Sequence, residues 1–137
     1  AMWFDHHLHT AASNVPPEAF RGAFAEAPSA ARLVYEYFGG EGAMPQFAEL
    51  VRETDRLDSA DLTPSDVLDP QSYIKLGFTI DGRTGLGTFE RYFLQLVELL
   101  RAEIPISAIL DEPAVRKRCE MLESENERFC KELAGAE

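Results

Sequence analysis

The feature that most constrains the fold is a succession of segments in which apolar residues recur at helical spacing. The first segment covers residues 28–38, begins with Pro28 and stops at the glycine pair 39–40, as is typical of one helix. The second segment covers residues 44–62. One face of this second segment carries Phe47, Leu50, Val51, Thr54 and Leu57. Both segments are therefore predicted to be amphipathic helices that bury one side.

The stretch between residues 62 and 87 contains two helix-start signals. Thr63-Pro64 and Asp69-Pro70 each place a capping oxygen ahead of a proline, so a short helix is predicted to start at each pair. The apolar run at residues 73–80 is also compatible with a strand, because short apolar runs are ambiguous by periodicity alone. Helix is the preferred interpretation of this run.

Two longer helical patterns complete the chain. Residues 89–103, which Thr88 can cap, carry a broad apolar face that must be buried. A short turn is expected over residues 105–110, and the last helix is predicted within residues 112–137, beginning at Pro113. Its seam is spaced as in a coiled coil and consists of Val115, Cys119, Leu122, Asn126, Phe129 and Leu133. Such a narrow seam needs a partner helix, from this chain, another chain or a further domain.

Strand signals are few. The segment "MWF" at residues 2–4 is too short to form a sheet alone. Residues 10–28 are rich in alanine, proline and glycine without periodicity, which predicts a loop with one short helical turn. The fold class is therefore predicted to be mainly α, with little or no sheet.

Length and charge limit the classes of function. The 137 residues suffice for one small core, and 24 acidic against 13 basic residues give a net charge of -11. Such a surface repels phosphate backbones, so a general nucleic-acid binder is not expected. No apolar stretch approaches the roughly 20 residues of a membrane span. Cys119 and Cys130 are expected to be reduced thiols, and the location is expected to be cytoplasmic.

An aspartate and two histidines follow the apolar stub at the start of the chain. Asp5, His6 and His7 stand next to one another in "WFDHHLHT". Imidazole and carboxylate together suit divalent transition metals, although a metal site needs more ligands than three neighbours supply. The alternative interpretation is a polar chain terminus without a metal.

Four segments together resemble one known family. They are "WFDHH", "PSAARLVYEYF", "ETDRLDSADLTPSDVLDP" and "TIDGRTGLGTFERYFLQLV". In this order and at these separations they resemble the exopolyphosphatase-related branch of the DHH phosphoesterase superfamily, over roughly residues 3–133. The resemblance implies an α/β catalytic domain with a two-metal site, typically manganese, that hydrolyses phosphoester or phosphoanhydride bonds.

The resemblance also implies roles for the residues at the start of the chain. His6 resembles the direct metal ligand of the family, and Asp5 resembles a ligand or a group that fixes the imidazole tautomer. His7 resembles the histidine that faces the substrate phosphate.

The family's next metal-binding aspartate lies about fifty residues downstream, at the end of a helix, and Asp55 is assigned to that position. Asp58 and Asp81 are its rivals, although either residue could instead cap a helix or lie on a solvated surface. Arg83 could contact a phosphate or only brace its glycine-flanked turn.

The chain departs from the family at both ends. Members carry strands with an HxxPDxD-like segment before the DHH motif, and a glycine-rich substrate-binding domain after the last helix. Residues 2–111 are therefore expected to be the C-terminal part of a DHH catalytic domain, and residues 112–137 a linker helix towards an absent domain. The expected fold is a mainly α fragment of an α/β domain. Its half site should bind Mn²⁺ or Mg²⁺ weakly and be inactive alone.

Two classes of function follow from these observations. The first is a metal-dependent phosphoesterase related to exopolyphosphatases, acting on a phosphorylated small molecule, polyphosphate or a short oligonucleotide. The alternative is a small acidic helical module that binds another protein without catalysis. An enzyme should bring Asp5, His6 and Asp55 close together, whereas an interaction module has no reason to.

A homo-oligomer, most simply a dimer, is expected through residues 89–100 or 115–133.

Overall fold

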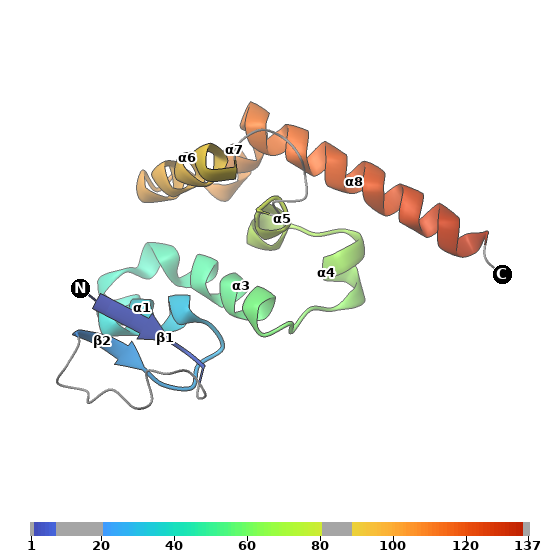
Figure 1. The fold of residues 1–137 in the computed structure, drawn as a ribbon. Coiled ribbons are helices and arrows are strands. Elements are labelled where there is room, and N and C mark those ends of the chain that lie inside the picture. Colours follow the sequence, from blue (N-terminus) through green and yellow to red (C-terminus); the bar gives the residue numbers. More distant parts are fainter. Residues whose placement is uncertain (1, 8–20, 81–88, 136–137) are drawn as a thin grey trace. The chain divides into compact units, whose positions relative to one another are not determined.

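The computed structural model describes residues 2–7, 21–80 and 89–135 (Figure 1). The chain divides into two compact units, an N-terminal unit of residues 1–62 and a C-terminal unit of residues 63–137. Helices make up most of the described residues, so the predicted mainly α fold is confirmed. The domain boundary predicted after residue 111 concerns a longer protein and stays a prediction. None of the described helices is both long and apolar enough to cross a membrane.

The N-terminal unit begins with a parallel pair of strands, β1 (Met2–Asp5) and β2 (Arg21–Phe24). The prediction of a loop throughout residues 10–28 was therefore wrong over β2. Gly22 explains the close pairing, because its φ of 140° is in the region that favours glycine. A Cβ atom at this position would lie 1.8 Å from the carbonyl oxygen of Trp3. The segment "MWF" thus pairs with β2, a strand that lies within residues predicted from their composition to form a loop.

Four helical elements follow the strands in the N-terminal unit. They are α1 (Ala30–Tyr37), α2 (Gly40–Ala43), the 3₁₀ turn η3 (Pro45–Phe47) and α3 (Ala48–Asp58). Helix α1 packs against both strands and against α3. The helix predicted to begin at Pro28 begins at Ala30 instead, because Ser29 is its N-cap and accepts a hydrogen bond from the Arg32 amide at 3.0 Å.

The C-terminal unit consists of five helices. They are α4 (Pro64–Leu68), α5 (Ser72–Phe78), α6 (Phe89–Arg101), α7 (Ile106–Asp111) and α8 (Pro113–Ala134). Thr63 and Asp66 form a reciprocal capping box on α4, as the start signal at Thr63 predicted. Asp69, in contrast, ends α4, and Gln71 rather than Asp69 is the N-cap of α5. Thr88, the predicted cap of α6, lies outside the described residues.

The burial of apolar side chains explains why two of these elements, α5 and α7, are helices. The ambiguous run at residues 73–80 is mostly helical, because helix α5 turns Ile74 and Leu76 into the interior. The turn predicted over residues 105–110 is instead helix α7, which places Ile109 at 0% exposure. In both places a buried apolar side chain favours the helix over the alternative.

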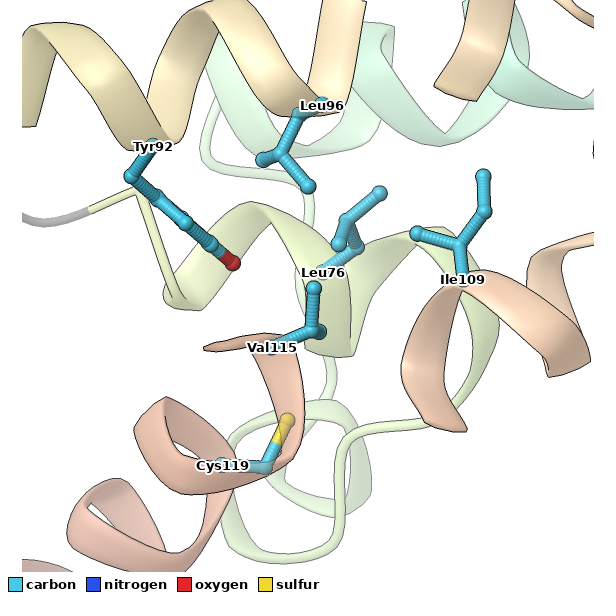
Figure 2. Close-up of a cluster of buried hydrophobic side chains, with 6 residues drawn as sticks. All are labelled: Leu76, Tyr92, Leu96, Ile109, Val115 and Cys119. Atoms are coloured by element: carbon cyan, nitrogen blue, oxygen red, sulfur yellow. The ribbon is translucent and has the colours of Figure 1, made fainter. Parts of the chain in front are cut away.

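The core of the C-terminal unit joins α5, α6, α7 and α8 (Figure 2). It consists of Leu76, Tyr92, Leu96, Ile109, Val115 and Cys119. The Tyr92 hydroxyl lies 2.6 Å from Oγ1 of Thr79, and the Arg118 guanidinium stacks 4.0 Å from the centre of the Tyr92 ring. The first part of the predicted seam, Val115 and Cys119, is therefore buried against helices of its own chain.

Candidate functional site

The carboxyl end of strand β1 brings three potential metal ligands together. Asp5 is the last residue of the strand, and His6 and His7 follow it. One ligand atom from each of the three side chains lies within 4.8 Å of the others. The carboxyl end of a parallel strand is also where ligands commonly bind in α/β proteins. The cluster predicted from "WFDHH" is thus assembled by the strand itself.

Asp5 orients the exposed histidine of the cluster. Oδ1 of Asp5 accepts a hydrogen bond from the His7 amide at 2.9 Å and lies 3.1 Å from Nδ1 of His7. A carboxylate that accepts from Nδ1 fixes the tautomer and the ring direction of an imidazole. The His7 side chain is 66% exposed, so this oriented ring is accessible from solution.

His6 faces a carboxylate from another element. Its Nε2 lies 3.5 Å from Oδ2 of Asp58, the last residue of α3. Two atoms that each lie about 2.1 Å from one cation are themselves roughly 3 to 3.5 Å apart. The structure therefore gives Asp58, one of the rival aspartates, the separation from His6 that a shared metal ion requires.

The second nitrogen of His6 has a different environment. Nδ1 of His6 is buried, and in the part of the chain that the structure describes it has no hydrogen-bond partner. Buried polar nitrogens are normally satisfied, so such an atom calls for an explanation. Asp5, His6 and His7 offer two imidazoles and one carboxylate within 4.8 Å, and Asp58 adds a second carboxylate beside His6. These groups suit a divalent cation such as Mn²⁺.

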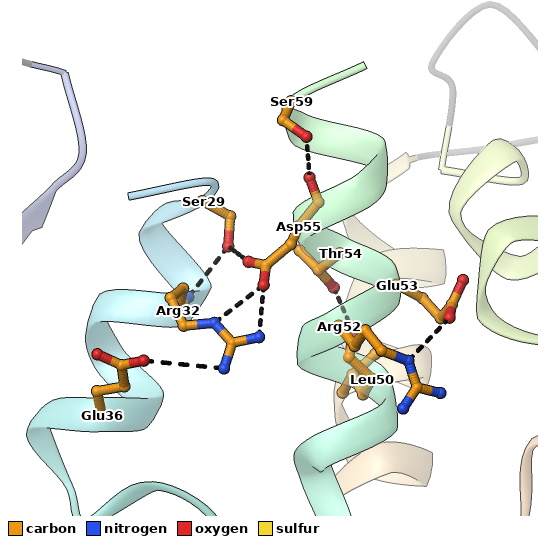
Figure 3. A network of polar contacts seen from close by, with 9 residues as sticks. All are labelled: Ser29, Arg32, Glu36, Leu50, Arg52, Glu53, Thr54, Asp55 and Ser59. Carbon is orange, nitrogen blue, oxygen red and sulfur yellow. Dashed lines mark hydrogen bonds and ion pairs between the residues drawn. The ribbon is translucent and has the colours of Figure 1, made fainter. Parts of the chain in front are cut away.

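Asp55 has different partners (Figure 3). Its Oδ1 accepts a hydrogen bond from the Ser29 hydroxyl at 2.6 Å. Its Oδ2 accepts from Nε of Arg32 at 2.9 Å and from Nη2 of the same guanidinium. The Asp55 side chain is 13% exposed and is thus held between α3 and the start of α1. The ligand role assigned to Asp55 stays a prediction, but in this geometry its carboxylate is occupied by Ser29 and Arg32.

Sequence reasoning did not single out Ser29 and Arg32. A signal for Ser29 was present, because a serine just before a helical pattern is a typical N-cap. What the sequence does not show is that Arg32 would meet an aspartate of another helix. Asp81 and Arg83, the remaining predicted site residues, lie outside the described residues.

Comparison with known proteins finds similarity among solved structures. No protein-family model matches the chain, and neither does any curated protein. A solved structure does: PggH, the pGpG-specific phosphodiesterase from Vibrio cholerae, with a TM-score of 0.71 and 33% sequence identity over 87% of this chain. The chain is related to a phosphodiesterase. It spans 39% of the length of that enzyme.

This relation confirms the coarse part of the sequence-based resemblance. A match in both sequence and fold supports a relation to phosphoesterases, and a mainly α chain is consistent with a portion of such an enzyme. The assignment to the exopolyphosphatase-related branch stays a prediction, as does the predicted role of manganese.

Proposed function

We propose that this chain is part of a metal-dependent phosphoesterase of the DHH type, with its metal site at the carboxyl end of β1. The observation that carries the proposal is the cluster of Asp5, His6 and His7, with Asp58 beside His6, in a chain similar to a phosphodiesterase. In this proposal Asp5, His6 and Asp58 hold Mn²⁺ or Mg²⁺, and Asp58 takes the ligand role that sequence assigned to Asp55.

The cation would supply an activated water and would neutralise charge on the phosphoryl group. The protein's own residues have separate tasks. Asp5 contacts Nδ1 of His7 and orients the ring, so that its exposed edge can contact a phosphate oxygen. Asp58 keeps His6 in place from the end of α3. His7 would therefore contact the phosphate, while its neighbours Asp5 and His6, with Asp58, would hold the cation.

The substrate class follows from the same comparison. PggH is specific for pGpG, a short oligonucleotide, and this favours a short oligonucleotide or another small phosphorylated molecule over long nucleic acids. Polyphosphate is the alternative that the exopolyphosphatase-related resemblance implies. The net charge of -11 also favours substrates that arrive with divalent cations. Free Cys119 and Cys130 fit the cytoplasmic location that we propose.

The chain also offers surfaces for association. Helix α6 exposes Phe93, Leu94 and Val97, and the far half of α8 exposes Phe129. A pocket of about 320 Å³ in the C-terminal unit is lined mainly by apolar side chains, Val67, Leu68 and Phe129 among them. These surfaces support the homo-oligomer that we propose, and they favour protein binding as the second candidate function.

A manganese titration tests the metal site. Paramagnetic Mn²⁺ should broaden the imidazole NMR signals of His6 and His7 first, and His6→Ala or Asp58→Asn should weaken Mn²⁺ binding by about tenfold or more. Asp111→Asn, which removes an exposed carboxylate of α7, is the matched control for nonspecific binding to an acidic chain. Equal binding by all variants would contradict the proposal.

An activity assay tests the completeness of the site. The 137-residue chain with Mn²⁺ should show no measurable hydrolysis of pGpG or polyphosphate, since a single cation cannot stabilise both the attacking and the leaving oxygen. Brisk turnover of either compound would show that the residues present are sufficient.

A further inference from the structure

The contact between α1 and α3 contains an ion pair that the proposed site does not use. Asp55 receives three hydrogen bonds, two from Arg32 and one from Ser29, and Ser29 is only 1% exposed. We propose that Asp55 and Arg32 are positioning residues, which hold the end of α3 so that Asp58 faces His6. This inference rests on the proposed function, because it concerns the ligand set named there.

The link from Asp55 to Asp58 runs along the last turn of α3. The two residues are three positions apart and so lie on neighbouring parts of one helical face. The backbone carbonyl of Asp55 also accepts from Ser59, from its amide at 3.0 Å and its hydroxyl at 2.7 Å. Asp55 therefore fixes its helix turn twice, through its side chain to α1 and through its carbonyl to the helix end beyond Asp58.

The link from Arg32 to His6 runs through α1. Ser29 and Arg32 lie at the start of this helix, which packs against β1 and β2. The ring of Phe4 on β1 lies 5.2 Å from the ring of Tyr37 at the other end of α1. The strand that leads to His6 and the arginine that holds Asp55 are thus attached to one helix. The ion pair between Arg32 and Asp55 joins the two halves of the proposed ligand set.

A direct ligand role for Asp55 and a positioning role make opposite predictions for Arg32. A guanidinium has no lone pair to offer and cannot bind a cation. If Asp55 were a ligand, Arg32→Met would remove a competing positive charge, and Mn²⁺ affinity would stay equal or rise. If Asp55 positions Asp58, Arg32→Met should weaken Mn²⁺ binding by about tenfold, in the range for residues that orient metal ligands.

The test compares Mn²⁺ affinity of the full chain by calorimetry and by paramagnetic broadening of the histidine signals. The matched control is Arg52→Met, which removes an exposed arginine of α3 that pairs only at the surface with Glu53. This control should bind Mn²⁺ as the unsubstituted chain does. A tenfold loss in Arg32→Met, with a normal control, supports the positioning role, whereas unchanged or tighter binding overturns it.

A double substitution with Asp58→Asn shows whether Arg32 acts on Mn²⁺ affinity through Asp58 or through the stability of the unit as a whole. If Arg32 acts through Asp58, then Arg32→Met should have almost no further effect on Mn²⁺ affinity in a chain that already carries Asp58→Asn. A merely structural role would weaken binding by the same factor in both backgrounds, and that result would overturn the proposal. Arg32→Lys keeps the charge but not the forked geometry, so it should restore part of the affinity lost in Arg32→Met.

Two further comparisons complete the design. If Arg32→Met does not fold, Ser29→Ala takes its place. This variant should lose less Mn²⁺ affinity, and the loss should again be absent when Asp58→Asn is also present. An equal loss with and without Asp58→Asn would contradict the positioning role. His6→Ala and Asp58→Asn show whether the proposed function itself holds. If these two variants bind Mn²⁺ normally, the metal site is wrong. If they lose Mn²⁺ and Arg32→Met does not, only the positioning role is wrong.

Discussion

Nε2 of His6 lies 3.5 Å from Oδ2 of Asp58, so the imidazole that follows β1 faces the carboxylate that ends α3. This contact distinguishes the two adjacent histidines. The His6 side chain is 17% exposed and faces Asp58, whereas the His7 side chain is 66% exposed and contacts Asp5. In the proposed function, His6 is accordingly the residue that holds the cation, and His7 the residue that contacts a ligand from solution.

Replacement of His7 should affect phosphate more than metal. In the Mn²⁺-loaded chain, His7→Ala should weaken binding of inorganic phosphate by about tenfold, the effect of losing one charge-assisted hydrogen bond. Mn²⁺ affinity should change by less than about threefold, because His7 is not assigned to the cation. Phosphorus NMR follows the phosphate and calorimetry the metal. A parallel loss of both affinities would make His7 a metal ligand instead.

Replacement of Gly22 should separate the two strands. In Gly22→Ala the new Cβ would collide with the Trp3 carbonyl, and alanine is strained at a φ of 140°. We expect a loss of about 2 kcal/mol or more in the free energy of unfolding, together with weaker Mn²⁺ binding. Gly42→Ala is the control, since its Cβ would meet no atom within 4 Å, and urea unfolding of the two variants gives the comparison. Similar stabilities would argue against the parallel pairing.

Alkaline pH should destabilise the C-terminal unit. Burial raises the pKa of the Cys119 thiol above its ordinary 9.0 and that of the Tyr92 hydroxyl above 10.0. The hydrogen bond to Glu123 raises the pKa of Lys75 above 10.5. Each group binds its proton more tightly when folded, so its contribution is present below the unfolded pKa and is lost as pH rises through the folded one.

The free energy of unfolding should therefore fall as pH rises above about 9, with the Cys119 thiol titrating first. Cys119→Ala lowers stability at neutral pH because it removes a buried side chain, but it should flatten the early part of this decline. Urea unfolding at several pH values between neutral and strongly alkaline gives both slopes. A Cys119→Ala slope identical to that of the unsubstituted chain would rule out the thiol as the first group.

Self-association should depend on one of two exposed apolar faces. Light scattering should give a mass near twice 15.3 kDa at high concentration. Phe93→Glu on α6 and Phe129→Glu on α8 each place a charge on one candidate face, and the variant that restores the monomer identifies the interface. A monomer at every concentration of the unsubstituted chain would contradict the proposed oligomer.

Most of the described helices could be predicted from the sequence, because an amphipathic pattern indicates both a helix and the side of it that is buried. Strand β2 was not readable, since its short segment around Gly22 has neither alternation nor β-branched residues, and only the close approach of Trp3 explains it. Helix α7 was missed for a related reason. Its stability comes from the burial of Ile109 among three other helices rather than from a local signal.

Some residues of the candidate site could be identified from the sequence, and others could not. Adjacent residues such as Asp5, His6 and His7 were found because a strand end presents them together. The choice between Asp55 and Asp58 could not be made from sequence, because both lie near the end of one helix and are the same residue type. Contacts from outside that helix distinguish the two carboxylates. Arg32 occupies the first carboxylate, and His6 faces the second.

The parallel pairing of β1 with β2 also bears on how this chain behaves in concentrated solution. Within the described residues these two strands pair only with each other, so each keeps one backbone edge whose N–H and C=O groups have no strand beside them. Open edges of this kind attract strands from other molecules, and Met2 and Trp3 on β1 are exposed. The edges are only four residues long and the chain carries a net charge of -11, and both features oppose edge-to-edge aggregation. Salt or divalent cations, by screening that charge, should therefore bring the chain closer to aggregation through these edges.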